Sequence, residues 1–242
     1  MKFLKITFFF IFLSSLAANS QTISKGEVIY KVNNQSLNII KNDSVKKNIP
    51  KIKNLLKNEK KLEYILVFDK NLSFFSKKNR LENNKMNLTE IMAGKGSYYT
   101  DTSKESILLR KEAYGENFIV SLPTKKWQVT QISKKIGNYL CYKAITRKEI
   151  EGRWGKKILE ITAWFTPEIS VNFGPKEYNN LPGLILELNE NGIVYTASKI
   201  TLNSKKRLKI SKPSSGKKVS IDEYNKISKE MYYKFKKSRK KN

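Results

Sequence analysis

The sequence predicts a mainly β protein, built as a single curved antiparallel sheet or as an open barrel or sandwich of about ten strands. Three observations lead to this fold class. Short segments in which apolar and polar residues alternate recur along the chain, and clusters of turn-forming residues separate them. Aromatic residues make up 11% of the 242 residues, which is too many for a disordered chain. We also expect a C-terminal helix and one or two short helices.

The expected strands follow one another at short intervals. They cover residues 26–32, 62–68, 72–75, 97–100, 106–110, 117–121, 126–131, 139–147, 157–166, 184–188 and 193–200. A tight hairpin is expected where Asp69-Lys70-Asn71 separates the second and third segments. The last two segments are joined across Asn189-Glu190-Asn191-Gly192, and the Asn-Gly pair supplies the positive φ angles that a hairpin turn needs.

Two segments depart from the strand pattern. Residues 44–60 carry apolar residues at roughly helical spacing with Pro50 among them, so either a helix begins there or the segment is a loose lysine-rich loop. We favour a short helix after Pro50. Near the other end, Ser220 and Glu223 have the spacing of a capping box. The apolar residues of the amphipathic helix that would follow are Tyr224, Ile227, Met231 and Phe235.

The chain divides into four parts on this interpretation. They are a leader at 1–20, a β-rich domain at 21–205, a linker at 206–219, and a helix with a basic tail at 220–242. The linker contains Lys212-Pro213-Ser214-Ser215-Gly216, in which proline and glycine interrupt regular structure. We expect the helix to pack on the same domain, because its apolar stripe needs a partner.

The first twenty residues have the three-part pattern of a secretory signal peptide. Lys2 and Lys5 form a basic start, residues 8–13 are an unbroken apolar run, and small residues precede a cleavage expected between Ser20 and Gln21. The apolar run is too short for a membrane anchor, which needs about 20 residues. The pattern therefore predicts export to the periplasm or to the cell surface. No later segment of the sequence is long and apolar enough to span a membrane.

Two residue counts exclude whole classes of site. The chain has no histidine, so it cannot form a Ser-His-Asp or Cys-His arrangement or a histidine-ligated zinc site. It has one cysteine, which excludes an internal disulfide and a multi-cysteine metal site. We expect no cofactor and no metal.

The charge of the chain is strongly positive. Lys and Arg total 48 against 21 Asp and Glu, which gives +27, and removing the leader with its two lysines leaves 46 − 21 = +25. Such a charge raises nucleic acid as a partner. Only six of the basic residues are arginines, however, and arginine is preferred for bidentate phosphate and base contacts. We favour a solvated basic surface and expect no nucleic-acid partner.

An ordered series of motifs occupies the second half of the chain. Its members are Trp127, Tyr142 to Thr146, Gly152-Arg153, Ala163 to Ile169, Phe173-Gly174-Pro175 and Leu181 to Leu188. The series resembles the GLPGLI family, which are exported proteins of Gram-negative bacteria, across residues 26–32 and about 120–200, and the C-terminal helix is also similar. Asn180 stands where the first glycine of the family motif stands, and asparagine tolerates a left-handed φ. The resemblance implies an exported, β-rich protein without an established activity.

The segment that carries these motifs is the candidate ligand loop. Its family-motif residues are Trp164, Phe165, Gly174, Pro175, Leu181, Pro182, Gly183, Leu184 and Ile185. One interpretation is structural: the Gly-Pro and Pro-Gly pairs are strong turn formers and fix how one strand crosses to the next. The other is functional: the loop forms the mouth of a ligand site, with Trp164, Phe165, Phe173 and Tyr178 as apolar walls. We favour the structural interpretation.

Few candidates for catalysis remain. Glu160 and Glu187 could serve as the two acids of a glycosidase, although Glu160 lies in an alternating strand where solvent exposure is the simpler interpretation. Cys141 could be a reactive thiol, although a small buried apolar residue is favoured in the absence of histidine. We therefore expect no catalytic residues and no enzyme.

Two hypotheses for function follow. The first is a non-catalytic binding module of the cell envelope, in which a curved sheet takes up a hydrophobic or envelope-derived ligand or partner. The second is a structural envelope-associating protein whose basic surface and tail contact anionic lipid or polysaccharide. An internal apolar cavity lined by Trp164, Phe165, Tyr139 or Tyr195 would favour the first. A sheet whose concave face is filled by its own C-terminal helix would indicate that the aromatic residues serve packing.

Overall fold

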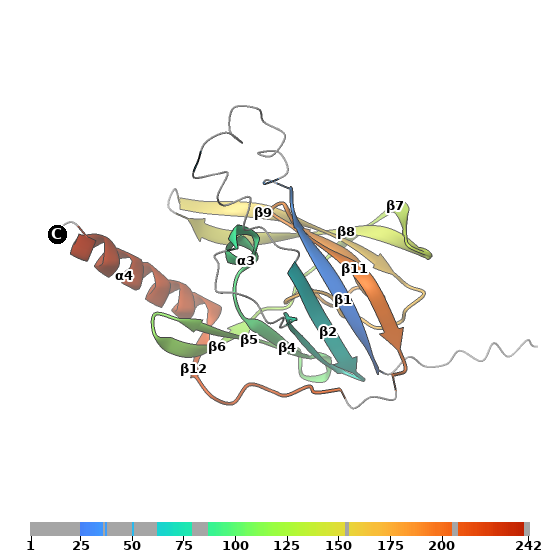
Figure 1. Cartoon of the computed structure of the whole chain (residues 1–242), viewed down its shortest axis with the longest axis horizontal. Helices are drawn as coiled ribbons and strands as arrows, with labels where there is room; N and C mark the ends of the chain where they lie inside the picture. Colours follow the sequence, from blue (N-terminus) through green and yellow to red (C-terminus); the bar gives the residue numbers. More distant parts are fainter. Residues whose placement is uncertain are drawn as a thin grey trace, which may run out of the picture.

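The computed structural model describes residues 25–35, 37, 50, 62–78, 87–152, 155–204 and 208–239. Twelve strands form one curved open sheet in the order β12-β6-β5-β4-β3-β2-β1-β11-β10-β9-β8-β7 (Figure 1). The strands are β1 (Lys25–Asn34), β2 (Leu62–Asp69), β3 (Leu72–Lys77), β4 (Ser97–Asp101), β5 (Ser106–Ala113), β6 (Glu116–Leu122), β7 (Gln128–Ile136), β8 (Tyr139–Gly152), β9 (Gly155–Thr166), β10 (Leu184–Glu190), β11 (Ile193–Leu202) and β12 (Lys217–Ser220). The mainly β, open-sheet class is confirmed, and every expected strand overlaps an observed one.

The sheet is antiparallel except at one edge. β1 lies near its middle and pairs with β2 on one side and β11 on the other, so the first and last strands of the β-rich domain are neighbours. At the far edge β12 runs parallel to β6, which makes the sheet mixed and not wholly antiparallel as expected. The first three residues of β12, 217–219, fall in the segment expected to be a linker. The four residues of β12 include two lysines and show no alternation, so the sequence carried no signal for it.

The expected hairpin turns form as predicted. Asn191 and Gly192 have φ of 52° and 83°, the positive pair that the β10–β11 turn requires. The backbone N–H of Gly192 also donates to Asn189 Oδ1 at 3.0 Å. Lys70 adopts φ of 52° in the β2–β3 hairpin.

Helix α4 (Ile221–Arg239) begins at the predicted capping box. The backbone N–H of Glu223 donates to Ser220 Oγ at 3.2 Å, and the backbone N–H of Ser220 donates to Glu223 Oε2 at 2.7 Å. One or two short helices were expected, and α3 (Leu88–Ala93) is one, at a position that was not predicted from the sequence. Asn87 caps it by accepting from the Glu90 N–H at 2.9 Å. A 3-10 turn, η2 (Thr102–Lys104), follows β4.

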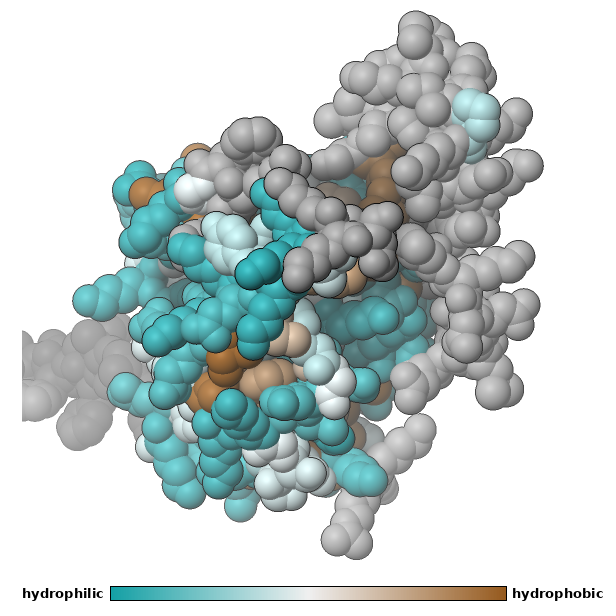
Figure 2. All heavy atoms as spheres, turned by 90° about the vertical axis from the view of Figure 1, so that its left-hand side faces the viewer, coloured by the Kyte–Doolittle hydropathy of each residue, from teal (hydrophilic) through white to brown (hydrophobic). Residues whose placement is uncertain are grey.

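Only the first half of α4 packs on the sheet. Tyr224 is buried with its ring 5.3 Å from that of Phe118 on β6, and Ile227 lies against the same small cluster. The second half projects away from the sheet (Figure 1), and Phe235, expected on the packed stripe, is 59% exposed. The side of the molecule from which α4 projects is mostly hydrophilic, with a few small apolar patches (Figure 2).

The core lies on one face of the sheet, called here the inner face. Alternate residues of β1 and β2 point to it, and the register places Tyr30 opposite Tyr64 and Val28 opposite Leu66. A cluster of aromatic rings packs together on this face, with centroid distances of 5.3 to 6.3 Å: Tyr30, Tyr64, Phe75, Tyr98 and Tyr195. These five rings pack against one another and form the aromatic part of the core near β1, β2 and β3.

Some predictions lie outside the described residues. They are the signal peptide at 1–20, the helix after Pro50, and the tail beyond residue 239. Within the described ranges, no helix is long and apolar enough to cross a bilayer.

Candidate functional site

The segment that joins β9 to β10, residues 167–183, is called here the motif loop. From residue 173 to residue 179 every residue is buried, which is unusual for a connection between strands. The loop lies over the inner face of the sheet. The ring of Phe173 is 5.9 Å from that of Phe68 on β2, and the Tyr30 hydroxyl of β1 donates to the Ile185 carbonyl at 2.6 Å, directly after the loop. The loop therefore packs into the core on the inner face, where Phe173 and Tyr178 are buried with residues of β1 and β2.

Several backbone groups of the motif loop make hydrogen bonds, as expected for a buried connection. The N–H groups of Leu184 and Ile185 donate to the carbonyls of Ile169 and Phe173, both at 3.0 Å, so the loop forms a pair of bonds with the start of β10. The Trp127 indole N–H donates to the Asn179 carbonyl at 2.7 Å from the segment before β7. These bonds fix the loop on the sheet.

Two glycines let the loop approach its surroundings closely. At Gly183, with φ of 151°, a Cβ would lie 2.1 Å from the Thr166 carbonyl oxygen. At Gly174 a Cβ would lie 2.6 Å from Ile185 Cδ1 and 2.8 Å from the Tyr178 carbonyl oxygen. Neither position has room for a side chain. The Gly-Pro and Pro-Gly pairs thus serve backbone geometry, in line with the structural interpretation of the motif.

Two other loop residues adopt left-handed backbone angles. Asn180 has φ of 65°, so the asparagine that replaces the glycine of the family motif keeps the conformation expected of it. Lys176 has φ of 59°, which is uncommon for a residue with a long side chain. Such a conformation persists where surrounding contacts hold it. The contacts of Lys176 are ionic.

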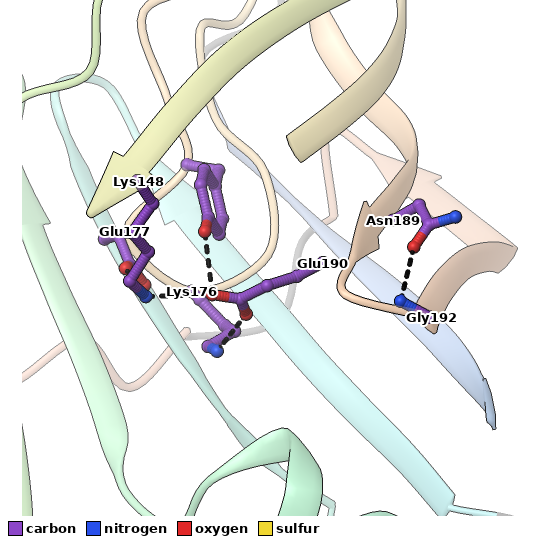
Figure 3. Close-up of polar contacts among 7 residues, drawn as sticks. Lys148, Lys176, Glu177, Asn189, Glu190 and Gly192 are labelled. Atoms are coloured by element: carbon purple, nitrogen blue, oxygen red, sulfur yellow. Dashed lines mark hydrogen bonds and ion pairs between the residues drawn. The ribbon is translucent and has the colours of Figure 1, made fainter. Parts of the chain in front are cut away.

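A buried charge cluster lies where the motif loop meets β8 and β10 (Figure 3). Its members are Lys148, Lys176, Glu177, Tyr178 and Glu190. Lys148 Nζ lies 2.8 Å from Glu177 Oε1 and 2.8 Å from Glu190 Oε1, and Lys176 Nζ pairs with Glu190 Oε2. The Tyr178 hydroxyl donates to Glu190 Oε1 at 2.8 Å. The side chains of Lys176 and Glu177 are 8% and 4% exposed, so these ions are almost fully desolvated.

The cluster stabilises the charged forms of Glu190 and Lys148. Burial works against the charge of Glu190, but the ammonium groups of Lys176 and Lys148 outweigh it and lower the pKa of this carboxyl from 4.5 to about 2. Burial likewise opposes the charge of Lys148, and Glu177 and Glu190 raise its pKa above 10.5. Two cations face two anions, so the cluster balances its own charge.

Two buried acceptors near the cluster have no donor among the described residues: Glu177 Oε2 and Asn179 Oδ1. The sequence pointed to Tyr178 alone among the members of the cluster, and only as an apolar wall, because the other four look like ordinary charged residues. The available signal was that Lys176 and Glu177 stand inside an otherwise apolar motif segment. Within the described ranges, no group of three or more acidic or cysteine side chains could hold a metal ion.

The proposed apolar walls of the loop do not line one mouth. Phe165 is buried on the inner face, where its ring lies 6.3 Å from that of Tyr142. Trp164 points to the opposite face, since neighbouring residues of a strand alternate. There Lys134 Nζ lies 4.3 Å from the centre of the Trp164 ring and 2.7 Å from Glu187 Oε1. The indole is part of a strand-bridging contact.

The candidate catalytic residues are also separated. Glu187 lies opposite Trp164, whereas Glu160 lies opposite Arg147, so the two acids are offset by four residues, about 13 Å along the strand. That offset exceeds the separations used in glycoside hydrolysis, about 5 to 9.5 Å. The thiol of Cys141 is fully buried, and burial raises its pKa to about 11, so it is protonated at neutral pH.

Comparisons with known proteins agree with this description of the fold. The family described as a protein of unknown function (Porph_ging) matches residues 150–187, from the end of β8 through the motif loop into β10. No curated protein matches the chain. A structure of PNGF-II in the C2 space group is 14% identical, covers 84% of this chain and 32% of that chain, and has a TM-score of 0.52.

A second structure of PNGF-II, in the P21 space group, gives 15% identity, the same coverage and a TM-score of 0.51. At this identity the likeness shows the fold alone. The chain spans 32% of the length of the PNGF-II chains.

Proposed function

We propose that this chain is an exported, non-catalytic binding module of the cell envelope, and that it holds its partner on its outer surface and not inside the sheet. The observation that carries the proposal is the close packing of the inner face. The motif loop covers it, and the aromatic rings that could have lined a cavity contact one another. The signal-peptide pattern and the GLPGLI-like motif series support an exported envelope protein.

The chemistry of the outer surface favours an anionic partner. The mature chain carries 46 basic against 21 acidic residues, and the cluster of Lys148, Lys176, Glu177 and Glu190 balances its own charge. The cluster therefore adds nothing to the excess positive charge, and described lysines and arginines on several strands are exposed. Lys31, Arg147 and Lys199, on three strands of the sheet, are exposed examples. Anionic lipid and anionic polysaccharide are the envelope components that such a surface attracts.

The absence of a catalytic role rests on the candidates already described. Glu160 and Glu187 are offset along the sheet, Cys141 is buried and protonated, and the charged groups of the cluster are paired with one another. None of them offers a reactive group to a substrate on the surface. A binding role does not require a reactive group.

Co-sedimentation of the mature chain, residues 21–242, tests the proposal. We expect the protein to sediment with envelope polysaccharide or with vesicles that contain an anionic lipid, and to be released by salt, because salt screens exposed charges. Native mass spectrometry of protein purified from its own host should show no apolar ligand. An apolar molecule of constant mass retained by the protein would overturn the proposal, and so would failure to bind either anionic material.

A further inference from the structure

The projecting half of α4, residues 229–239, has the composition of a segment that contacts a membrane surface. Three large aromatic side chains are exposed there: Tyr232 at 49%, Tyr233 at 57% and Phe235 at 59%. Five basic residues accompany them against one acidic residue, and 231–239 contains no acid at all. Exposed aromatic residues among lysines are typical of helices at the boundary between water and lipid.

The apolar stripe of α4 continues from the part of the helix that packs on β6 into this segment. Tyr224 and Ile227 pack on β6, and Met231 and Phe235 continue the same stripe at spacings of four residues. The stripe thus runs from a buried anchor to an exposed end, and Figure 1 shows that end as the part of α4 farthest from the sheet. The helix is held at its base and presents its other end outward.

We propose that residues 229–239 form a docking segment for an anionic lipid bilayer, with the aromatic rings at the level of the headgroups and the lysines on lipid phosphates. This inference rests on the proposed function and names its partner and its contact surface. Lys234, Lys236 and Lys237 are all exposed and can extend their ammonium groups toward phosphate while their stems cover apolar surface.

Charge selects a bilayer over a second copy of the chain. Two copies of residues 229–239 would each bring a net charge of 5 − 1 = +4 to the same interface, and like charges repel. The surrounding face is mostly hydrophilic (Figure 2), which does not suit a large apolar protein interface. An anionic bilayer neutralises the positive charge of residues 229–239, and its headgroup region can accommodate the aromatic rings.

The test uses the mature chain and vesicles of phosphatidylcholine, with and without phosphatidylglycerol. We expect binding to the anionic vesicles. We expect the triple variant Tyr232→Ser, Tyr233→Ser, Phe235→Ser to bind them at least about tenfold more weakly than wild type. The matched control is Val129→Ser with Ile132→Ser, which removes similarly exposed apolar side chains from β7, and it should bind as wild type. Unchanged melting midpoints would show that all variants are folded.

A charge-matched pair of variants separates this inference from the proposed function. Lys234→Gln with Lys236→Gln and Lys237→Gln should weaken binding to anionic vesicles much more than Lys31→Gln with Arg147→Gln and Lys199→Gln, although each set removes three charges. Equal losses would overturn the docking segment while leaving a basic binding surface intact. Binding to polysaccharide alone would also overturn it. Failure to bind any anionic material would overturn the proposed function itself.

Discussion

At the scale of single residues, Gly183 is the most constrained position of the motif loop. It combines a positive φ with a backbone contact that a Cβ could not tolerate, whereas Gly94 has a positive φ of 82° and open space around it. The two glycines therefore separate the conformational cost of a side chain from its steric cost. Gly94 is the natural control.

Gly183→Ala should lower the free energy of unfolding by about 2–4 kcal/mol, because backbone strain and overpacking against the Thr166 carbonyl add. Gly94→Ala should lower it by about 1–2 kcal/mol, from strain alone. Denaturant unfolding of both variants measures the difference. Equal losses would show that the contact with Thr166 relaxes without cost.

Asn180→Gly belongs beside these variants. Asn180 already adopts φ of 65°, so glycine gains little there and the free energy of unfolding should stay close to that of wild type.

Asn180 also shows which features of a single residue can be predicted from the sequence. Asparagine is one of the few residue types that favour a left-handed backbone conformation, so the positive φ at Asn180 was predictable from the sequence. The 2.1 Å approach at Gly183 depends on which strand end lies opposite, and no local pattern encodes that.

At the scale of elements, the charge cluster attaches the motif loop to β8 and β10. Because the pKa of Glu190 is lower in the folded protein than in the unfolded chain, the unfolded chain binds the proton more readily. The stabilisation is complete above pH 4.5 and is lost as the pH falls from 4.5 toward 2. Acid should therefore weaken the attachment of the loop.

The difference in unfolding free energy between wild type and Glu190→Gln isolates this effect from the other carboxylates. It should be on the order of 3 kcal/mol at pH 7, since the pKa changes by 4.5 − 2 = 2.5, and it should approach zero near pH 2. Urea unfolding at a series of pH values measures it. A difference that does not change between pH 6 and pH 2 would contradict the role assigned to Glu190.

The elements themselves were largely predictable, and the exceptions have physical causes. The strands followed from alternation, and α4 followed from its capping box, since both signals are local. β12 was missed because a four-residue parallel edge strand is defined by its partner β6 and not by its own pattern. The charge cluster was missed for a similar reason: Lys148 and Glu190 meet Lys176 only after three strands and the loop have assembled.

At the scale of the whole molecule, sequence composition predicted the class and left the use of the aromatic residues open. Tyr30, Phe75 and Tyr195 could have lined a cavity or packed together, and the same alternation serves both. The motif loop folds back over the inner face, and these rings pack against one another there. That arrangement moves the available binding chemistry to the outer surface, where charge dominates.

The charge of +27 makes a further prediction about the whole fold. Like charges on the surface repel one another in the compact state, and salt screens exposed charges more than buried ones, so the charge cluster should be little affected. The melting midpoint should therefore rise as sodium chloride is added at low concentration. The variant Lys31→Gln with Arg147→Gln and Lys199→Gln carries three fewer positive charges, and its midpoint should rise less.

A midpoint that falls with salt would mean that exposed ion pairs, such as Lys156 with Glu149 at 2.7 Å, contribute more than the repulsion. Calorimetry of both proteins over the same salt series distinguishes the two outcomes.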